Sequence, residues 1–204
     1  MTASTEEIYS EDYFNYLHKR SAIRKAVRTF YLKDIRKHCV GKTIDFGCGT
    51  GELLKTLPEG SIGFEVNKIA VEFCKKNGLT VDLYNPEADK YEFQMIEKDK
   101  FQTFTMNHVL EHIEESHKTI NRIFESCNRL GIRRIVFTVP GQKGFQMDKT
   151  HITFIDLKYF ENNGLLGNAY YELNYSNYFP FRSAKVGHYF RHNELRLVFD
   201  QRTK

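Results

Sequence analysis

The stretch DFGCGTGELL (residues 45–54) decides the fold. It follows the short β-prone run TIDF (43–46) and passes into ELLKTL (52–57), which has the pattern of a helix start. Glycines at every second position let the backbone take positive φ values and approach a ligand closely. A strand that turns through such a loop into a helix is typical of a doubly wound sheet, in which ligands bind at the carboxyl ends of the strands. The sequence therefore predicts a ligand-binding loop directly after the first strand.

The rest of the chain alternates short apolar runs with helix-like segments. Further strands are expected at 61–66, 79–84, 101–107, 133–140, 169–176 and 194–200. Helices are expected at 67–78, 114–131 and 157–164, and one or two more within 12–38. This alternation predicts a mostly parallel α/β sheet with helices on both faces, and the last two strands, joined without a helix, predict an antiparallel edge. We expect a single domain at 41–204, preceded by a helical lid at 1–40.

Composition excludes several classes of protein. The chain has 204 residues with 41% hydrophobic and 27% charged residues, which is ordinary for a globular domain. No apolar run approaches the roughly 18 residues of a membrane span, and the acidic N-terminus lacks the apolar core of a signal peptide. The four cysteines form no CxxC pair and are expected to be reduced thiols of a cytoplasmic protein. A membrane protein, a disulfide scaffold and a repeat array are therefore not expected.

The glycine loop departs from the dinucleotide-binding fingerprint. The third glycine of GxGxxG would stand at position 52, where this chain has Glu52. A negative side chain at a helix start is a poor host for a pyrophosphate, which disfavours a nicotinamide dehydrogenase. Glu65 ends the second expected strand, 20 residues after Asp45, where a carboxylate can accept the hydroxyls of a ribose. The loop therefore favours a nucleoside ligand that has no phosphate at this point.

At this point the motifs resemble a known family. The segment DFGCGTGELL looks like the first signature of class I S-adenosylmethionine-dependent methyltransferases, and GFEVNKIAVEFCKKNG (63–78) resembles the second. The segment MNHVLEHI (106–113) resembles the end of their fourth strand. The stretch 139–165 resembles the region after strand five in small-molecule and glycan methyltransferases. The resemblance covers about residues 12–200 and implies a seven-stranded Rossmann-like sheet with S-adenosylmethionine as cofactor.

The resemblance also implies a set of cofactor contacts. The methionine part would lie over Asp45, Gly47 and Gly49, with the ribose on Glu65 and the turn at 107–108 lining the methyl end. The full set of expected cofactor-binding residues is Asp45, Gly47, Cys48, Gly49, Gly51, Glu65, Val66, Asn107 and His108.

Histidines near the expected methyl position are candidates for the chemistry. Methyl transfer to a hydroxyl needs orientation and a base whose pKa is near working pH, which favours histidine. His112 follows the fourth strand, and Asp148 and His151 follow the fifth, so these three are the candidate catalytic residues. The alternative for the last two is a mutual hydrogen bond that ties down the loop at 141–153.

The main interpretation includes no metal, but a metal-dependent alternative stays open. Four side chains could serve as ligands: His108, Glu111, His112 and His151. Small-RNA 2′-O-methyltransferases use a similar Glu/His cluster, with a glutamate where this chain has His108.

Two expected loops, 141–153 and 177–193, carry basic residues beside aromatic ones. Such loops suit a small molecule with a sugar or ring and a negative group. We therefore expect O-methylation of a sugar, nucleotide-sugar or glycan intermediate. A nucleic-acid partner is disfavoured by the net charge of only +4. Two alternatives remain, an RNA 2′-O-methyltransferase-like enzyme with the Glu/His metal cluster and a non-catalytic subunit that binds the cofactor as a scaffold.

Overall fold

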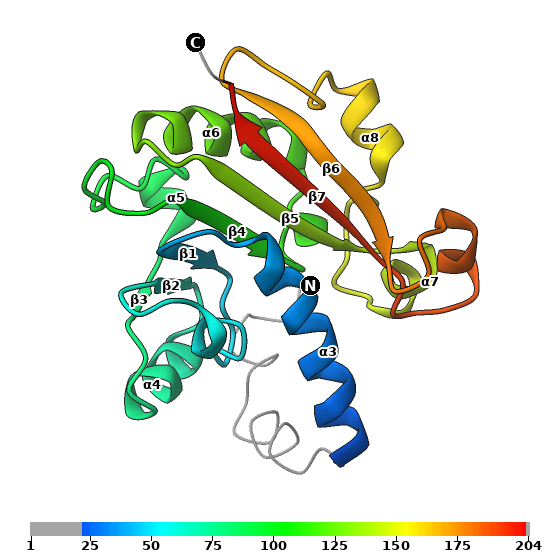
Figure 1. Cartoon of the computed structure of the whole chain (residues 1–204), viewed down its shortest axis with the longest axis horizontal. Coiled ribbons are helices and arrows are strands. Elements are labelled where there is room, and N and C mark those ends of the chain that lie inside the picture. Colours follow the sequence, from blue (N-terminus) through cyan, green and yellow to red (C-terminus); the bar gives the residue numbers. More distant parts are fainter. Residues whose placement is uncertain (1–21, 203–204) are drawn as a thin grey trace.

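The computed structural model describes residues 22–202 and contains one seven-stranded sheet (Figure 1). The strand order is β3-β2-β1-β4-β5-β7-β6. The first five strands in sequence are parallel, whereas β7 runs antiparallel to β5 and β6 antiparallel to β7. Their bounds are β1 (Thr43–Phe46), β2 (Ile62–Glu65), β3 (Val81–Leu83), β4 (Thr103–Asn107), β5 (Arg134–Pro140), β6 (Tyr171–Phe179) and β7 (Glu194–Gln201). The predicted parallel sheet with an antiparallel edge is confirmed.

Helices cover both faces of the sheet, as predicted. They are α3 (Ala22–His38), α4 (Lys68–Lys76), α5 (Pro86–Asp89), α6 (Ser116–Arg129), α7 (Gln142–Met147) and α8 (Leu157–Asn162). One apolar cluster joins α3 and α4 through Leu32, Ile35 and Val71. A second, larger cluster joins α6 and α8 to the strands through Ile123 and Phe160. Figure 1 draws α6 above and α3 below strand β4.

The sheet topology fixes where a ligand can bind. The strand order switches at β1: the chain adds β2 and β3 on one side of it, and then β4 and β5 on the other. In open α/β sheets the crevice forms outside the carboxyl ends of the strands at this switch point. Because β7 is antiparallel, its first residue Glu194 pairs with Pro140 at the end of β5. Glu194 therefore lies at the same edge of the sheet as the ends of the parallel strands.

Two local expectations need correction, and a third lies partly outside the described residues. The helix expected after the glycine loop is only a 3₁₀ turn (η1, Leu54–Thr56), because Pro58 bars continuation through Leu57, which is extended. The loop expected at 141–153 contains α7, and another 3₁₀ turn, η2 (Leu110–His112), follows β4. Of the lid expected at 1–40, only residues from Ala22 are described, and they form α3; residues 1–21 lie outside the described part.

Two absences hold for the residues that the structure describes. Within 22–202, no helix combines the length and apolar character that a membrane crossing requires. The four cysteines, all within this range, are free and buried.

Candidate active site

The glycine loop crosses the carboxyl ends of β1 and β2. Gly47 has φ +70, and a Cβ there would lie 2.3 Å from a methyl carbon of Val109. Gly49 has φ +54, and a Cβ there would meet no atom within 4 Å. Gly47 is therefore required for packing as well as conformation. The open side of Gly49 allows a ligand to approach the backbone.

Glu65 holds the glycine loop together. Its carboxylate accepts hydrogen bonds from the backbone N–H of Gly49 at 2.8 Å, Val66 at 2.8 Å and Asn67 at 3.0 Å. The residue is only 3% exposed. A carboxylate has about four acceptor positions, so three are used here and one remains for a ribose hydroxyl. This loop-holding role was not predicted from the sequence, and the ribose contact stays a prediction.

Asp45 and Asn107 offer buried oxygens without partners. Oδ2 of Asp45 and Oδ1 of Asn107 have no hydrogen-bond partner among the described residues. Burial raises the pKa of Asp45 to about 7; the charge of Arg28 opposes this rise and that of Glu65 adds to it. Buried acceptors of this kind are costly unless a donor reaches them. A positively charged donor group, such as an ammonium, would satisfy both.

The remaining predicted cofactor residues occupy the rim of this crevice. Gly51 has φ +71, and a Cβ there would lie 2.3 Å from Leu79, so the position is confined by packing. Cys48 is buried, and its Sγ lies near the Cα of Gly63, so only its backbone lines the loop. The side chain of Val66 is 42% exposed beside the loop.

Helix α3 adds a cation that the sequence did not single out. Nε of Arg28 lies 3.0 Å from Oε2 of Glu52, the residue that follows the last glycine of the loop. Its charge lowers the pKa of both Asp45 and Glu194. Arg28 therefore stands between the glycine loop and the end of β7. Its place in a long charged helix gave no signal that would separate it from surface residues.

A second half of the site is formed by the turn after β4 and the loop after β5, and it begins at His108. This histidine follows β4 with φ +56, a conformation that costs a non-glycine residue about 1–2 kcal/mol. Its Nδ1 lies 3.3 Å from Oε1 of Glu111, and its Nε2 lies 3.2 Å from Oε1 of Glu194. Burial by itself would lower its pKa, but the two glutamates raise the pKa of His108 to about 10. The imidazolium therefore occupies a strained turn between two carboxylates.

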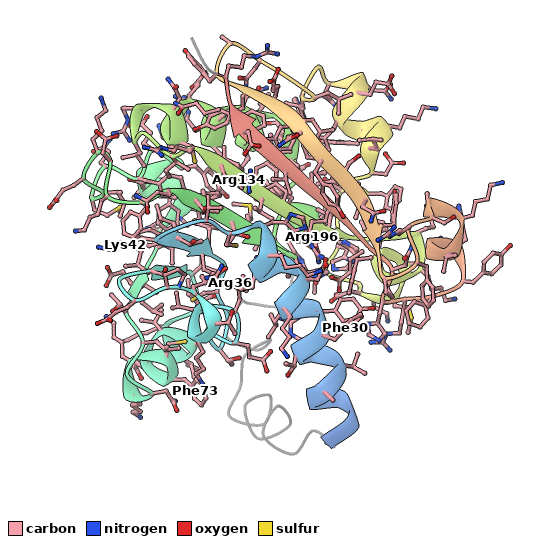
Figure 2. The ribbon with its side chains drawn as sticks, in the orientation of Figure 1. Phe30, Arg36, Lys42, Phe73, Arg134 and Arg196 are labelled. Carbon is pink, nitrogen blue, oxygen red and sulfur yellow. The ribbon has the colours of Figure 1, made fainter. Side chains whose placement is uncertain are left out.

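A buried ion network connects this turn to helix α3. Arg196 on β7 is 1% exposed; its guanidinium lies 3.6 Å from Glu194 and binds Asp34 of α3. Figure 2 shows Arg196 beside α3, the helix that also carries Phe30. Sequence reasoning missed Glu194 and Arg196. The available signal was two charges at alternate positions at the start of the strand ELRLVFD (194–200), whose next three residues are apolar.

The three predicted catalytic residues are brought together. The rings of His112 and His151 have centroids 4.8 Å apart. Nε2 of His151 lies 3.8 Å from Oδ2 of Asp148, which is too long for the predicted mutual hydrogen bond. Asp148 instead accepts hydrogen bonds from the backbone N–H and the hydroxyl of Thr150. The two side chains are therefore not hydrogen-bonded, but the backbone N–H of His151 donates to the carbonyl of Asp148 at 3.3 Å, so this pair and Thr150 both hold the loop.

Glu111 lies at the centre of this group. It is completely buried, and neither carboxylate oxygen has a hydrogen-bond partner among the described residues. Oε1 lies 3.8 Å from Nε2 of His151. One side-chain atom each from Glu111, His112 and His151 can be chosen so that all lie within 4.8 Å of one another.

The loops expected to face the substrate are exposed. Tyr189 is 87% exposed, and Phe181 packs edge-on against Phe190. The exposed basic residues of these loops are Lys143, Lys149, Arg182, Lys185 and Arg191. No aspartate or glutamate occurs from 173 to 193. The segment 173–193 thus combines aromatic rings with positive charge that none of its own residues neutralises.

Comparisons with known proteins agree with this geometry. A family model described as a methyltransferase domain matches residues 14–202. A search of curated proteins finds no match.

Solved structures of methyltransferases share the fold. An S-adenosylmethionine-dependent methyltransferase from Archaeoglobus fulgidus is 18% identical with a TM-score of 0.63, over 92% of this chain and 99% of that one. Magnesium protoporphyrin IX methyltransferase from Synechocystis PCC 6803 is 13% identical with a TM-score of 0.60, over 97% of both chains. The small RNA methyltransferase HEN1 is 17% identical with a TM-score of 0.63, over 89% of this chain but 25% of that one.

Proposed function

The chain belongs to the methyltransferase domain family, the class I S-adenosylmethionine-dependent methyltransferases, and from that membership we propose that it methylates a hydroxyl group of a small, polar, sugar-containing acceptor. The observation that carries the choice of a hydroxyl is the cluster of Glu111, His112 and His151 at the carboxyl edge of the sheet. A hydroxyl must lose its proton as the new C–O bond forms, and these residues offer acceptors for that proton.

The first half of the site supports the cofactor assignment. S-adenosylmethionine supplies the methyl group as a sulfonium electrophile and carries an ammonium, a carboxylate and a ribose. We assign the ammonium to Asp45 and Asn107, whose buried oxygens lack partners, and the carboxylate to Arg28. The remaining acceptor position of Glu65 suits a ribose hydroxyl. The open side of Gly49 leaves room for the part of the cofactor that joins its amino acid to its ribose.

The second half supports an oxygen acceptor. Nδ1 of His151 lies 3.0 Å from the carbonyl oxygen of Phe145, and Nδ1 of His112 lies 3.2 Å from that of Thr150. A carbonyl only accepts, so Nδ1 carries the hydrogen in both rings and Nε2 keeps its lone pair when the ring is neutral. His151 is the more buried of the two and faces Glu111 and Asp148. In this proposal His112 and His151 contact the acceptor oxygen, and Asp148 fixes the loop that carries His151.

The acceptor class follows from the exposed loops. Aromatic faces stack on sugars and rings, and the uncompensated cations attract a phosphate or carboxylate. A screen of methyl transfer should therefore detect S-adenosylhomocysteine formation with sugars, sugar phosphates or nucleotide sugars. His151→Gln should lose this turnover but keep S-adenosylhomocysteine binding, and His117→Gln, altered outside the cluster, should keep both. Transfer only to amines, thiols or protein would contradict the proposal, and cofactor binding without transfer to any acceptor would favour a scaffold role.

A second candidate is methylation of a ribose hydroxyl in RNA. One solved structure with this fold is named as a small RNA methyltransferase, and exposed aromatic rings with cations also suit single-stranded RNA. Short single-stranded oligoribonucleotides belong in the same screen, with oligodeoxyribonucleotides of the same sequence as the matched control. Transfer to the first and not to the second would favour this candidate over a small metabolite.

A further inference from the structure

We propose that Glu111, His112 and His151 bind one divalent transition-metal ion of the class that prefers imidazole ligands. The site lies at the carboxyl edge of the sheet, where the proposed function places the methyl acceptor, and away from the glycine loop. Its three ligands come from the turn after β4 and from the loop after β5.

The first support is the state of Glu111. The side chain is 0% exposed, yet both carboxylate oxygens lack a hydrogen-bond partner among the described residues. An ionised carboxylate is costly to bury unless it is paired or coordinates a metal. The ring of His108 lies 3.3 Å from Oε1 and pairs with it, but Oε2 has no hydrogen-bond partner among the described residues. A cation between Glu111 and the two imidazoles would satisfy this oxygen.

The second support is the orientation of the two imidazoles. Both rings direct Nδ1 at a backbone carbonyl, Phe145 for His151 and Thr150 for His112. Metal-bound histidines almost always donate their other ring N–H to such a partner, which fixes the tautomer and the ring. Both Nε2 atoms are therefore the available ligands. The ligand atoms lie within 4.8 Å of one another, and binding would draw them to within the roughly 4 Å that ligands about 2 Å from one ion can span.

The third support concerns the kind of ion. Both ring nitrogens of His108 face carboxylates, Glu111 and Glu194, so this residue is not a fourth ligand. The protein then offers two nitrogens and one carboxylate. Mg²⁺ prefers an octahedron of oxygens, whereas imidazole suits Zn²⁺, Co²⁺ and Fe²⁺. The ligand set therefore favours a transition metal over Mg²⁺.

An ion with three protein ligands keeps positions open for other ligands. A hydroxyl oxygen bound there would have a lower pKa and would release its proton to water as it takes the methyl group, with S-adenosylhomocysteine as the leaving thioether. His112 and His151 would then act as ligands rather than as free bases. This role rests on the proposed function, but the binding of the ion does not.

The test is a titration of the full chain after dialysis against a chelator. CoCl₂ is the probe, since its visible absorption changes with nitrogen ligation and coordination number. We expect one equivalent to bind, with an affinity at least about a hundredfold above that for MgCl₂ in the same buffer. No binding of Co²⁺, or equal binding of Mg²⁺, would overturn the proposal.

Variants separate the site from adventitious binding. Glu111→Gln keeps the size of the side chain, and His112→Gln alters an exposed ring. Each should weaken Co²⁺ binding at least about tenfold and change the spectrum, while His117→Gln should bind as the wild type does. Wild-type affinity in both cluster variants would contradict the assignment. The titration contains no acceptor or methyl donor, so its result is independent of the acceptor screen.

Discussion

The two halves of the carboxyl edge each contain a buried glutamate, and these two residues differ in their hydrogen bonding. Glu65, beside the glycine loop, accepts three backbone hydrogen bonds, whereas Glu111, after β4, accepts none among the described residues. The first half is held by backbone donors, and the second by charged side chains from distant segments. This difference indicates that the first half is built to fix a loop around a constant cofactor. In the second half the buried glutamate itself is left for a ligand, whereas in the first half only Asp45 and Asn107 are.

The largest expected effect concerns the ion network of the second half. Arg196→Met removes the guanidinium between Asp34 and Glu194 and leaves two buried carboxylates without it. We expect the free energy of unfolding to fall by about 3–5 kcal/mol, measured by urea denaturation. Arg134→Met is the matched control, because its pair with Asp200 is partly exposed and should contribute about 1 kcal/mol or less. An equal fall in the free energy of unfolding in the two variants would contradict the difference between a buried ion network and a partly exposed ion pair.

The next effect concerns the first half. Glu65→Gln keeps the shape but removes the charge that accepts three N–H groups, so the loop is held less firmly. S-adenosylhomocysteine should bind about 10–100-fold more weakly in calorimetry, because the glutamine oxygen still accepts part of the set and the loss of one charge-assisted hydrogen bond costs about 1.5–3 kcal/mol. Glu52→Gln, a partly exposed acid at the end of the same loop, should change the affinity only a few-fold. A larger loss of affinity in Glu52→Gln than in Glu65→Gln would contradict the loop-holding role of Glu65.

A pH dependence distinguishes Asp45 from its neighbours. Its pKa of about 7 means that Asp45 is protonated below pH 7 and ionised above it. An ammonium binds the ionised form, so affinity for S-adenosylhomocysteine should be constant above pH 7 and fall about tenfold per unit below it. Asp45→Asn should bind weakly at every pH. Because the folded-state pKa is raised, ionisation opposes folding, and this variant should unfold at higher temperature than the wild type at pH 8. A flat affinity profile from pH 6 to 8 would contradict the assignment.

The smallest effect tests Arg28. If its guanidinium binds the carboxylate of the cofactor, Arg28→Gln should weaken S-adenosylhomocysteine by about 2–5-fold, the size expected for a partly exposed charge pair. The same variant should bind 5′-methylthioadenosine, which lacks the amino acid part, as tightly as the wild type does. Equal weakening of both ligands would assign Arg28 to the packing of α3 instead.

The same contrast explains what could be predicted from the sequence. The sheet, the glycine loop and Glu65 follow from local patterns, because the donors to Glu65 lie within 16 residues of it. The group around Glu111 draws on the loop after β5 and on β7, and Arg196 binds a partner 162 residues away. Periodicity cannot show that an antiparallel β7 carries Glu194 to the end of β5. Asp148 and His151 are joined through the backbone and not through their side chains, because Thr150, two residues from Asp148, offers closer donors to its carboxylate.

The most direct test of the account is a calorimetric titration of the wild-type chain with S-adenosylhomocysteine, with NADH as the control ligand. The account predicts one equivalent of S-adenosylhomocysteine bound and no heat with NADH, since the glycine loop ends in Glu52 and lacks a site for pyrophosphate. Binding of NADH, or no binding of S-adenosylhomocysteine, would contradict it.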